Sequence, residues 1–274
     1  FGGSFTAIGR DYMIELLSSA QEFIGENGFK GIRISTRPDA VDGEICDILE
    51  KYHVTAVELG AQSTNDKVLA MNRRGHTRED IFRSARLLKE RGFETGLQMM
   101  TGLYGSNDED SIGTARDIIS LSPDTARIYP TVVIENTELA ELYRNGEYRP
   151  QTPEEAAVLC AKILPMFERA GIKVIRLGLH SGGDVEGSFV AGAYHPALRE
   201  MCEGHIYFDI INRALSGKEK GKYIIYVAPR EVSKASGQRR CNIEKLRELG
   251  YECRIKENAA LSARDITLEK VNLL

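Results

Sequence analysis

The sequence contains no apolar run of the roughly 18 residues that a membrane-spanning helix needs. It also shows no secretory signal peptide, and it begins with Phe1 rather than with methionine. We therefore expect no membrane partner. The unusual first residue indicates a fragment or a processed form of a longer protein.

Cysteine is scarce and irregularly placed. The five residues are odd in number and none of them forms a C-x-x-C pair, which argues against a disulfide framework and leaves no readable zinc spacing. This pattern favours a reducing, cytoplasmic setting with the cysteines as inert thiols. They are Cys46, Cys160, Cys202, Cys241 and Cys253.

Two common phosphate-binding motifs are also missing. No G-x-G-x-x-G follows any predicted strand, and there is no Walker A pattern. Their absence weakens, without removing, a doubly wound nucleotide-binding sheet as the competing architecture.

The charge that is present is unevenly distributed. The 274 residues carry a net charge of −4, yet the stretch from Arg213 to Lys256 holds 12 Lys and Arg against 5 Asp and Glu, a charge of +7. The rest of the chain therefore carries −4 − 7 = −11. A basic module attached to an acidic body indicates a polyanionic partner.

Short β-rich runs alternate with amphipathic helical stretches along most of the chain, which predicts right-handed βαβ units and a parallel sheet. Five runs follow the opening helix of residues 11–25, and Phe1 would be the last residue of a further strand. We predict a partial parallel (β/α)6-type, TIM-like barrel that lacks its first strand. The runs begin at Gly31, Thr55, Phe93, Thr125 and Lys173.

Glycine and hydrogen-bonding side chains gather where these predicted strands end. Ligands of parallel β/α folds bind at the carboxyl ends of the strands, and glycine lets the backbone approach a ligand closely. The pattern therefore predicts one shared pocket. The strand-end segments are GGS at Gly2, STRPD at Ser35, ELGAQS at Glu58, QMMTGLYG at Gln98, RIYP at Arg127 and RLGLHS at Arg176.

The phrases GGSFT, ISTRPD, VELGAQS, NRRGHT, MMTGLYG and RIYPTVVI, in this order, resemble the radical S-adenosylmethionine (SAM) superfamily, and within it the Elongator-protein-3-like group. The resemblance runs from Phe1 to Phe208. It implies a SAM-binding barrel over residues 1–208, followed by a small basic module over residues 209–274.

The resemblance also implies roles for individual residues, each at a matching position of the motifs. Gly2 and Gly3 would meet the amino group of SAM, and Arg74 would pair with its carboxylate, since a guanidinium fork suits that planar anion. The strand-end residues Gln62, Gln98 and Ser35 would serve the ribose and its surroundings. The adenine would lie near the apolar residues Met99, Met100 and Leu103.

Simpler interpretations compete with several of these roles. Arg74 could help to cap the helix that starts near Thr77, and His76 could be structural or a proton carrier. Glu58 could be a buried partner of Arg37 or a ligand contact. Strand alternation leaves open whether Arg127 and Tyr129 face the barrel mouth or its wall.

Radical SAM chemistry requires a [4Fe–4S] cluster held by three thiolates in C-x3-C-x2-C or a close variant, and the sequence contains no such triplet. In the family this motif precedes the glycine pair, so we expect it upstream of Phe1. The resemblance implies a parent enzyme that reductively cleaves SAM and acts on tRNA or another RNA. Because the sequence lacks the cysteine triplet, we expect this chain by itself to be inactive. The alternatives are a coproporphyrinogen-oxidase-like enzyme of a small substrate and a degenerate SAM- or RNA-binding barrel.

The basic module of residues 209–274 has a β-α-turn-α-β order that is similar to the core of a KH RNA-binding domain. Its turn, Gly237 to Arg240, has an arginine where a G-x-x-G loop has its second glycine. A small α/β cap on the barrel is the competing interpretation. In either case phosphates could meet a basic cluster of Lys234, Arg239, Arg240 and Lys245. No segment resembles the acetyltransferase domain of the Elongator-like relatives.

Overall fold

A computed structural model describes residues 4–26, 28–179 and 187–271, and the chain divides into two compact units. Unit 1 comprises residues 1–152 and 163–194, and unit 2 comprises residues 153–162 and 195–274. Residue 208, the predicted domain boundary, lies inside helix α9 (Leu198–Leu215). The whole of α9 belongs to unit 2, because its apolar residues pack in the core of that unit.

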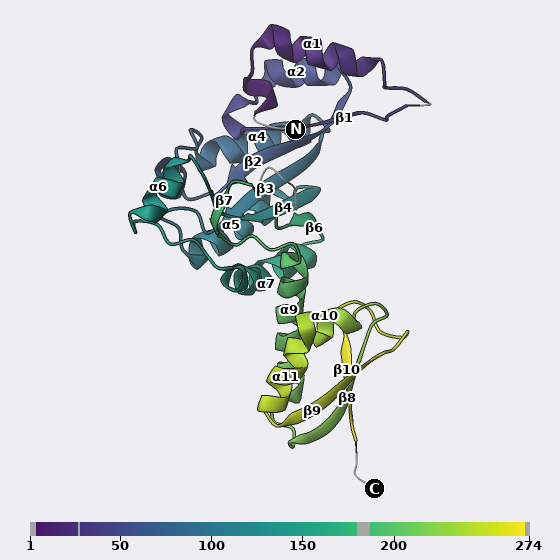
Figure 1. Cartoon of the computed structure of the whole chain (residues 1–274). Coiled ribbons are helices and arrows are strands. Elements are labelled where there is room, and N and C mark those ends of the chain that lie inside the picture. Colours follow the sequence, from purple (N-terminus) through teal and green to yellow (C-terminus); the bar gives the residue numbers. More distant parts are fainter. Residues whose placement is uncertain (1–3, 27, 180–186, 272–274) are drawn as a thin grey trace. The chain divides into compact units, whose positions relative to one another are not determined.

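Unit 1 is built on a parallel sheet of five strands in the order β1-β2-β3-β4-β6, which confirms the predicted parallel α/β architecture (Figure 1). In the described part of the chain β1 and β6 are the two edges, so these five strands do not close a barrel. The bounds are β1 Ile32–Thr36, β2 Val54–Gln62, β3 Glu94–Thr101, β4 Thr125–Pro130 and β6 Lys173–Leu177.

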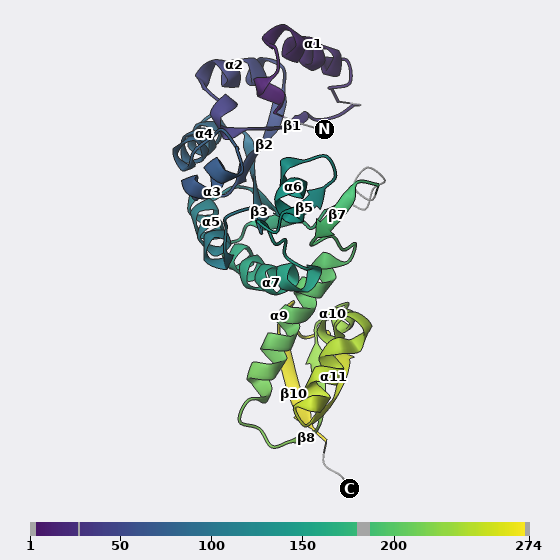
Figure 2. The same cartoon turned by 60° about the vertical axis from the view of Figure 1, so that its left-hand side comes forward.

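Helices connect these strands, and α2, α4 and α5 lie along one side of the sheet (Figure 2). Two begin in capping boxes: Thr77 with Asp80 at α4, and Asn107 with Asp110 at α5. The bounds are η1 Phe5–Ala7, α1 Arg10–Gln21, η2 Pro38–Ala40, α2 Gly43–Lys51, α3 Asp66–Met71, α4 Arg78–Glu90, α5 Asp108–Leu121, α6 Glu138–Arg144 and α7 Pro153–Arg169, whose residues are divided between the units.

The run that begins at Thr125 is not one strand. It breaks at Thr131, whose backbone N–H and hydroxyl both bind the carbonyl of Thr101. Beyond the break, β5 (Val132–Ile134) pairs in antiparallel fashion with β7 (Phe189–Gly192). A separate apolar cluster of Val133, Ala140 and Tyr148 packs β5 against α6. The change of partner at Thr131 therefore ends β4, and the chain continues in a separate two-stranded sheet.

Unit 2 contains a three-stranded sheet in the order β10-β8-β9, packed with α9, α10 and α11 (Figure 1). The predicted β-α-turn-α-β order is confirmed, and β10 adds an antiparallel strand that the sequence did not indicate. The KH likeness stays a prediction. The bounds are β8 Gly221–Val227, α10 Val232–Ser236, η3 Gln238–Arg240, α11 Cys241–Glu248, β9 Tyr251–Glu257 and β10 Ile266–Lys270.

A single buried amide joins three elements of unit 2. The Nδ2 of Asn242, at the start of α11, donates to the carbonyl of Gly204 in α9 at 2.8 Å and to that of Ala235 in α10 at 3.1 Å. Gly237 must lack a side chain here, because a Cβ would lie 2.7 Å from the Sγ of Cys241. The turn between α10 and α11 is therefore fixed from inside.

We expect Asn242→Ala to destabilise unit 2 by about 1–3 kcal/mol, because it removes the buried side-chain donor that joins the carbonyls of Gly204 and Ala235. Urea unfolding of the full chain, followed by circular dichroism, measures this loss. Glu248→Ala, on the exposed face of α11, is the matched control and should change stability by less than about 0.5 kcal/mol. Equal stability of both variants would contradict the role assigned to Asn242.

Within the ranges that the structure describes, no helix is both long enough and apolar enough to cross a lipid bilayer.

Candidate cofactor-binding site

A cavity of about 550 Å³ opens at the carboxyl ends of β1, β2 and β3, within the usual size range of small-molecule sites. The strand ends supply one part of its lining, and the loop between α3 and α4 supplies another. Four of the predicted site residues line it: Ser35, Gln62, Arg74 and Gln98. The predicted Gly2 and Gly3 lie outside the described residues.

A bulge in β2 directs Gln62 into this cavity. The pairing of β2 with β3 shifts between Gly60 and Gln62, and Gln62 has a left-handed φ of 63°, which is uncommon for a residue other than glycine. Its side-chain oxygen accepts a hydrogen bond from the Nε2 of Gln98 at 3.3 Å. The two predicted amides therefore form one polar wall.

The guanidinium of Arg74 reaches the cavity from the α3–α4 loop with few partners of its own. Its Nη2 lies 3.3 Å from the thioether sulfur of Met100, and its Nε is buried without a hydrogen bond to the described residues. Burial lowers the pKa of this guanidinium, as expected for a cation that lacks a nearby anion. The capping box of α4 is complete with Thr77 and Asp80, so Arg74 has no part in it.

Met100 lies beside Arg74 but is not among the residues that line the cavity. Met99 and Leu103, which were also predicted to lie near the adenine, are buried and are not among the residues that line the cavity. Successive side chains of a strand point to opposite faces, so Gln98 and Met100 share one face of β3 and Met99 takes the other.

Glu58 is the buried anion of the site, and its partner is not Arg37. It receives a hydrogen bond from the Nη2 of Arg127 at 2.8 Å, with the Nε of Arg127 2.7 Å from its second oxygen. Arg33 adds a third contact at 3.1 Å. Arg37 instead donates to the two carboxylate oxygens of Asp39 through its Nε and Nη2.

The ion pair of Glu58 with Arg127 crosses β3 at Gly96. In register, Gly96 lies between Glu58 of β2 and Thr125 of β4. A Cβ on Gly96 would lie 3.0 Å from the Cγ of Glu58 and 2.9 Å from the hydroxyl of Thr125. Arg127 lines the cavity together with Glu58, and its Nη1 also lies 3.2 Å from the hydroxyl of Tyr129.

Sequence reasoning missed Arg33 and offered Arg37, rather than Arg127, as the possible partner of Glu58. The signal for Arg33 was present: it stands two residues before Ser35, so both point to the same face of β1. The signal for Arg127 was weaker, because Glu58 and Arg127 are not register partners and meet only across a glycine.

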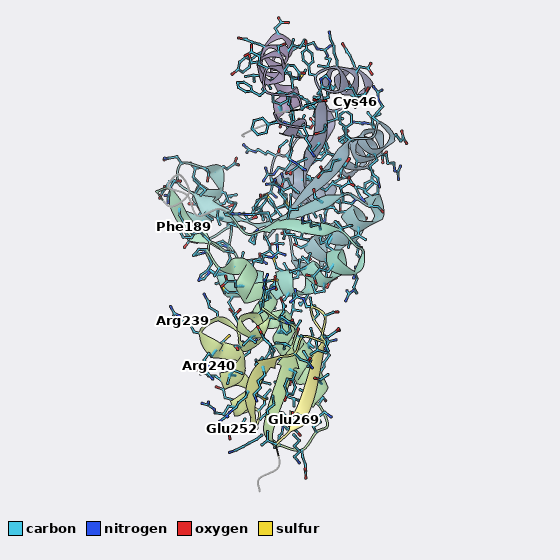
Figure 3. All side chains as sticks on the ribbon, turned by 90° about the vertical axis from the view of Figure 1, so that its right-hand side faces the viewer. Cys46, Phe189, Arg239, Arg240, Glu252 and Glu269 are labelled. Carbon is cyan, nitrogen blue, oxygen red and sulfur yellow. The ribbon has the colours of Figure 1, made fainter. Side chains whose placement is uncertain are left out.

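In unit 2 the predicted basic cluster is divided. The Nζ of Lys234 lies 2.9 Å from Glu203 and 2.7 Å from Glu231, so it is neutralised inside the unit. Arg239 and Arg240 are exposed, form no ion pair with the described residues, and extend from the outside of the turn before α11 (Figure 3). Lys245 lies over the ring of Phe208.

The cysteines do not fit an iron–sulfur cluster. The described residues include no group of three His, Cys, Asp or Glu side chains able to hold a metal ion. Four of the five thiols are buried, and burial raises the pKa of Cys160 to about 12 and that of Cys253 to about 11. A cluster ligand must be a thiolate, and these thiols are held in the protonated form.

Models of two protein families match the chain. The Radical SAM superfamily model matches residues 1–118, and the Radical_SAM C-terminal domain model matches residues 123–207. Together they include every strand of the parallel sheet and every cavity residue named above.

Two curated relatives have related names. The tRNA uridine(34) acetyltransferase of Methanocaldococcus jannaschii is 36% identical over 142 residues, which are 50% of this chain and 26% of that protein. Human Elongator complex protein 3 is 32% identical over 192 residues, 60% of this chain and 34% of that protein. The chain thus spans about a quarter to a third of the length of these relatives.

Solved structures agree with this relationship. The archaeal Elp3 of Methanocaldococcus infernus, with its N-terminus deleted, superposes with a TM-score of 0.62 and 25% identity, covering 76% of this chain and 57% of that one. Coproporphyrinogen III oxidase of Escherichia coli shares the fold, with a TM-score of 0.52 and 18% identity, covering 62% and 39% of the two chains. From its parallel sheet, its strand-end cavity and these matches, the chain belongs to the radical SAM superfamily and is a homologue of the Elongator protein 3 group.

Proposed function

We propose that the cavity of unit 1 binds SAM, and that Arg74 binds the carboxylate of its methionine moiety. One observation carries the proposal. The cavity is lined by four arginines, of which three already face a carboxylate: Arg37 faces Asp39, Arg73 faces Glu138, and Arg127 faces Glu58. Among the described arginines of this cavity, Arg74 alone faces a thioether, that of Met100, where the other three face a carboxylate.

The remaining polar residues of the cavity suit the rest of the ligand. Ser35 offers a hydroxyl, and the paired amides of Gln62 and Gln98 offer donors and acceptors on one wall, which are the groups that recognise ribose hydroxyls. The carboxylate of SAM would supply the anion that the buried guanidinium of Arg74 lacks, and would thereby raise its lowered pKa.

Equilibrium dialysis of the full chain against labelled SAM, with adenosine triphosphate as a competitor, tests this proposal. We expect saturable binding at one site that a nucleotide without the amino acid moiety does not displace. Absence of saturable SAM binding would remove the basis of the proposal.

A [4Fe–4S] cluster supplies the electron for SAM cleavage in this superfamily, and the described residues do not fit one. The role derived for these residues is therefore to bind and orient SAM.

We further propose that the protein acts in radical SAM modification of RNA, with tRNA as the substrate and the turn of unit 2 as a phosphate contact. The names of two relatives concern tRNA uridine 34 or the Elongator complex, and Arg239 with Arg240 are exposed cations without an ion-pair partner among the described residues. Lys234 contributes little, because two glutamates neutralise it.

We expect the double variant Arg239→Glu with Arg240→Glu to lower tRNA affinity at least tenfold at low salt. It should also reduce the slope of log K against log salt by about 1.5 to 2, because two phosphate contacts are lost. Filter binding over a salt series measures both. The control changes charge equally in unit 1, through Arg83→Glu with Arg144→Glu, two exposed and ion-paired residues. An equal loss of tRNA affinity in both double variants would show a general effect of charge and would contradict a specific phosphate contact at the turn of unit 2.

A further inference from the structure

His76 lines the cavity from the loop between α3 and α4 and is 5% exposed. Its Nε2 lies 3.1 Å from the carbonyl oxygen of Ala61. A carbonyl oxygen accepts and does not donate, so Nε2 carries a proton and is the donor of this bond. The Nδ1 is buried and has no hydrogen-bond partner among the described residues. The ring is therefore held by one polar contact, and that contact is to the end of β2.

The acceptor of this bond lies in the bulge that orients Gln62. Ala61 stands between the two residues where the β2–β3 register shifts, and its carbonyl also accepts the backbone N–H of Ser63 at 2.7 Å. The following residue, Gln62, has the left-handed φ of 63°. Such a conformation costs free energy and persists only when the surroundings determine it. The hydrogen bond from His76 is one such determinant.

The donor of this bond lies in the loop that carries Arg74. Only Gly75 separates Arg74 from His76, and its φ of +74° turns the chain so that both side chains reach the cavity. The loop is fixed at its start by the bond from Asn72 Nδ2 to the carbonyl of Tyr104 at 2.8 Å. It is fixed at its end by the capping box of α4. Between these points, two side-chain contacts among the described residues attach it to the sheet: the bond from His76 to Ala61 of β2 and the 3.3 Å contact of Arg74 Nη2 with the sulfur of Met100 in β3. Only the first of these contacts reaches the bulge that orients Gln62.

We propose that His76 is a positioning residue that sets the separation of Arg74 from Gln62 across the ligand cavity. This inference rests on the proposed SAM site. Arg74 would bind the carboxylate and Gln62 the ribose side, so the ligand spans the two segments that His76 joins. Loss of the bond removes the direct link between the loop and the bulge of β2, so the separation of Arg74 from Gln62 is less well defined and a ligand that contacts both binds less tightly.

Four variants of the full chain, tested for SAM binding by equilibrium dialysis, examine this role. His76→Phe keeps a ring of similar size but has no donor, and we expect it to weaken SAM binding at least tenfold. His76→Gln places an amide N–H near the position of Nε2 and should stay within about threefold of the unmodified chain. His76→Asn, whose shorter amide does not extend to that position, should resemble His76→Phe and serves in its place if the phenylalanine variant does not fold.

The fourth variant, Asn107→Ala, separates positioning from stability. It removes the capping box of α5, which lies outside both the Arg74 loop and the cavity lining, and should lower the thermal midpoint by about 2–4 °C with SAM affinity unchanged. A wild-type affinity in His76→Phe, an equal loss in His76→Gln and His76→Phe, or a tenfold loss in Asn107→Ala would each overturn the inference and leave the SAM site standing. Failure of the unmodified chain to bind SAM would instead overturn the proposed function and this inference with it.

Discussion

Replacing Glu58 by alanine is expected to destabilise unit 1 by about 2–4 kcal/mol. Removing one partner of a buried ion pair typically costs about 3–5 kcal/mol, because the other charge stays buried without compensation. The side chain of Glu58 is 6% exposed, whereas those of Arg127 and Arg33 are 26% and 36% exposed, so water recovers part of that cost. Urea unfolding of the full chain, followed by far-ultraviolet circular dichroism, measures the change.

Glu94 provides the matched control for this experiment. It also binds Arg33, but its side chain is 44% exposed, and Glu94→Ala should cost less than about 1 kcal/mol. Gly96→Val should resemble Glu58→Ala, since its side chain would occupy the space through which Glu58 reaches Arg127. Similar stabilities of the Glu58 and Glu94 variants would show that the buried pair does not hold β2 and β4 together.

Replacing Arg74 by methionine is expected to reduce SAM affinity by a factor of about 10–150, the loss of a charge-assisted hydrogen bond worth about 1.5–3 kcal/mol. The same substitution should leave the unliganded chain as stable as before, or more stable. Methionine keeps the apolar stem and removes a guanidinium that is desolvated without a carboxylate partner among the described residues. Equilibrium dialysis against SAM and thermal unfolding without ligand give the two measurements.

The combination of weaker binding and undiminished stability distinguishes a ligand-binding arginine from a structural one. Arg74→Lys should fall between wild type and Arg74→Met, since an ammonium keeps the charge but loses the planar fork. Arg83→Ala, an exposed arginine of α4 that pairs with Asp80, should bind SAM as the wild type does. A marked loss of stability in Arg74→Met with unchanged affinity would assign Arg74 to the scaffold.

Much of the architecture could be predicted from local patterns. The alternation of β-rich runs and amphipathic helices predicted the parallel sheet, because the helical stretches repeat their apolar residues with the period of a helix and the short runs between them do not. The same alternation placed Ser35, Gln62 and Gln98 at strand ends, and strand ends of a parallel sheet meet at one edge. Arg74 was predicted as a site residue from the NRRGHT motif, and in the structure it lines the same cavity. Short elements such as α3, β7 and β10 were not predicted, since a few residues carry too little periodicity.

Other features depended on contacts between residues distant in sequence. The break at Thr131 arises because Val133 finds its apolar partners in α6 and in Tyr148 rather than in the parallel sheet. Met99 and Met100 point to opposite faces of β3, and the sequence alone does not say which face is turned toward the cavity side. The alternation of side chains fixes the two faces relative to each other, but the register with the neighbouring strands decides which face is which. Lys234 looked like a free cation because its two glutamates lie on α9 and at the start of α10.

The sequence by itself determined the fold class, the edge of the sheet where the cavity opens and the superfamily, because these depend on repeated local patterns and on motifs read along the chain. Only the tertiary structure decided which charges are paired. The sequence offered Arg37 as the possible partner of Glu58, whereas the absence of a side chain at Gly96 lets Arg127 reach Glu58 across the intervening strand. The physical reason is that an ion pair forms where geometry permits a close approach, and that geometry is set by the register of three strands together.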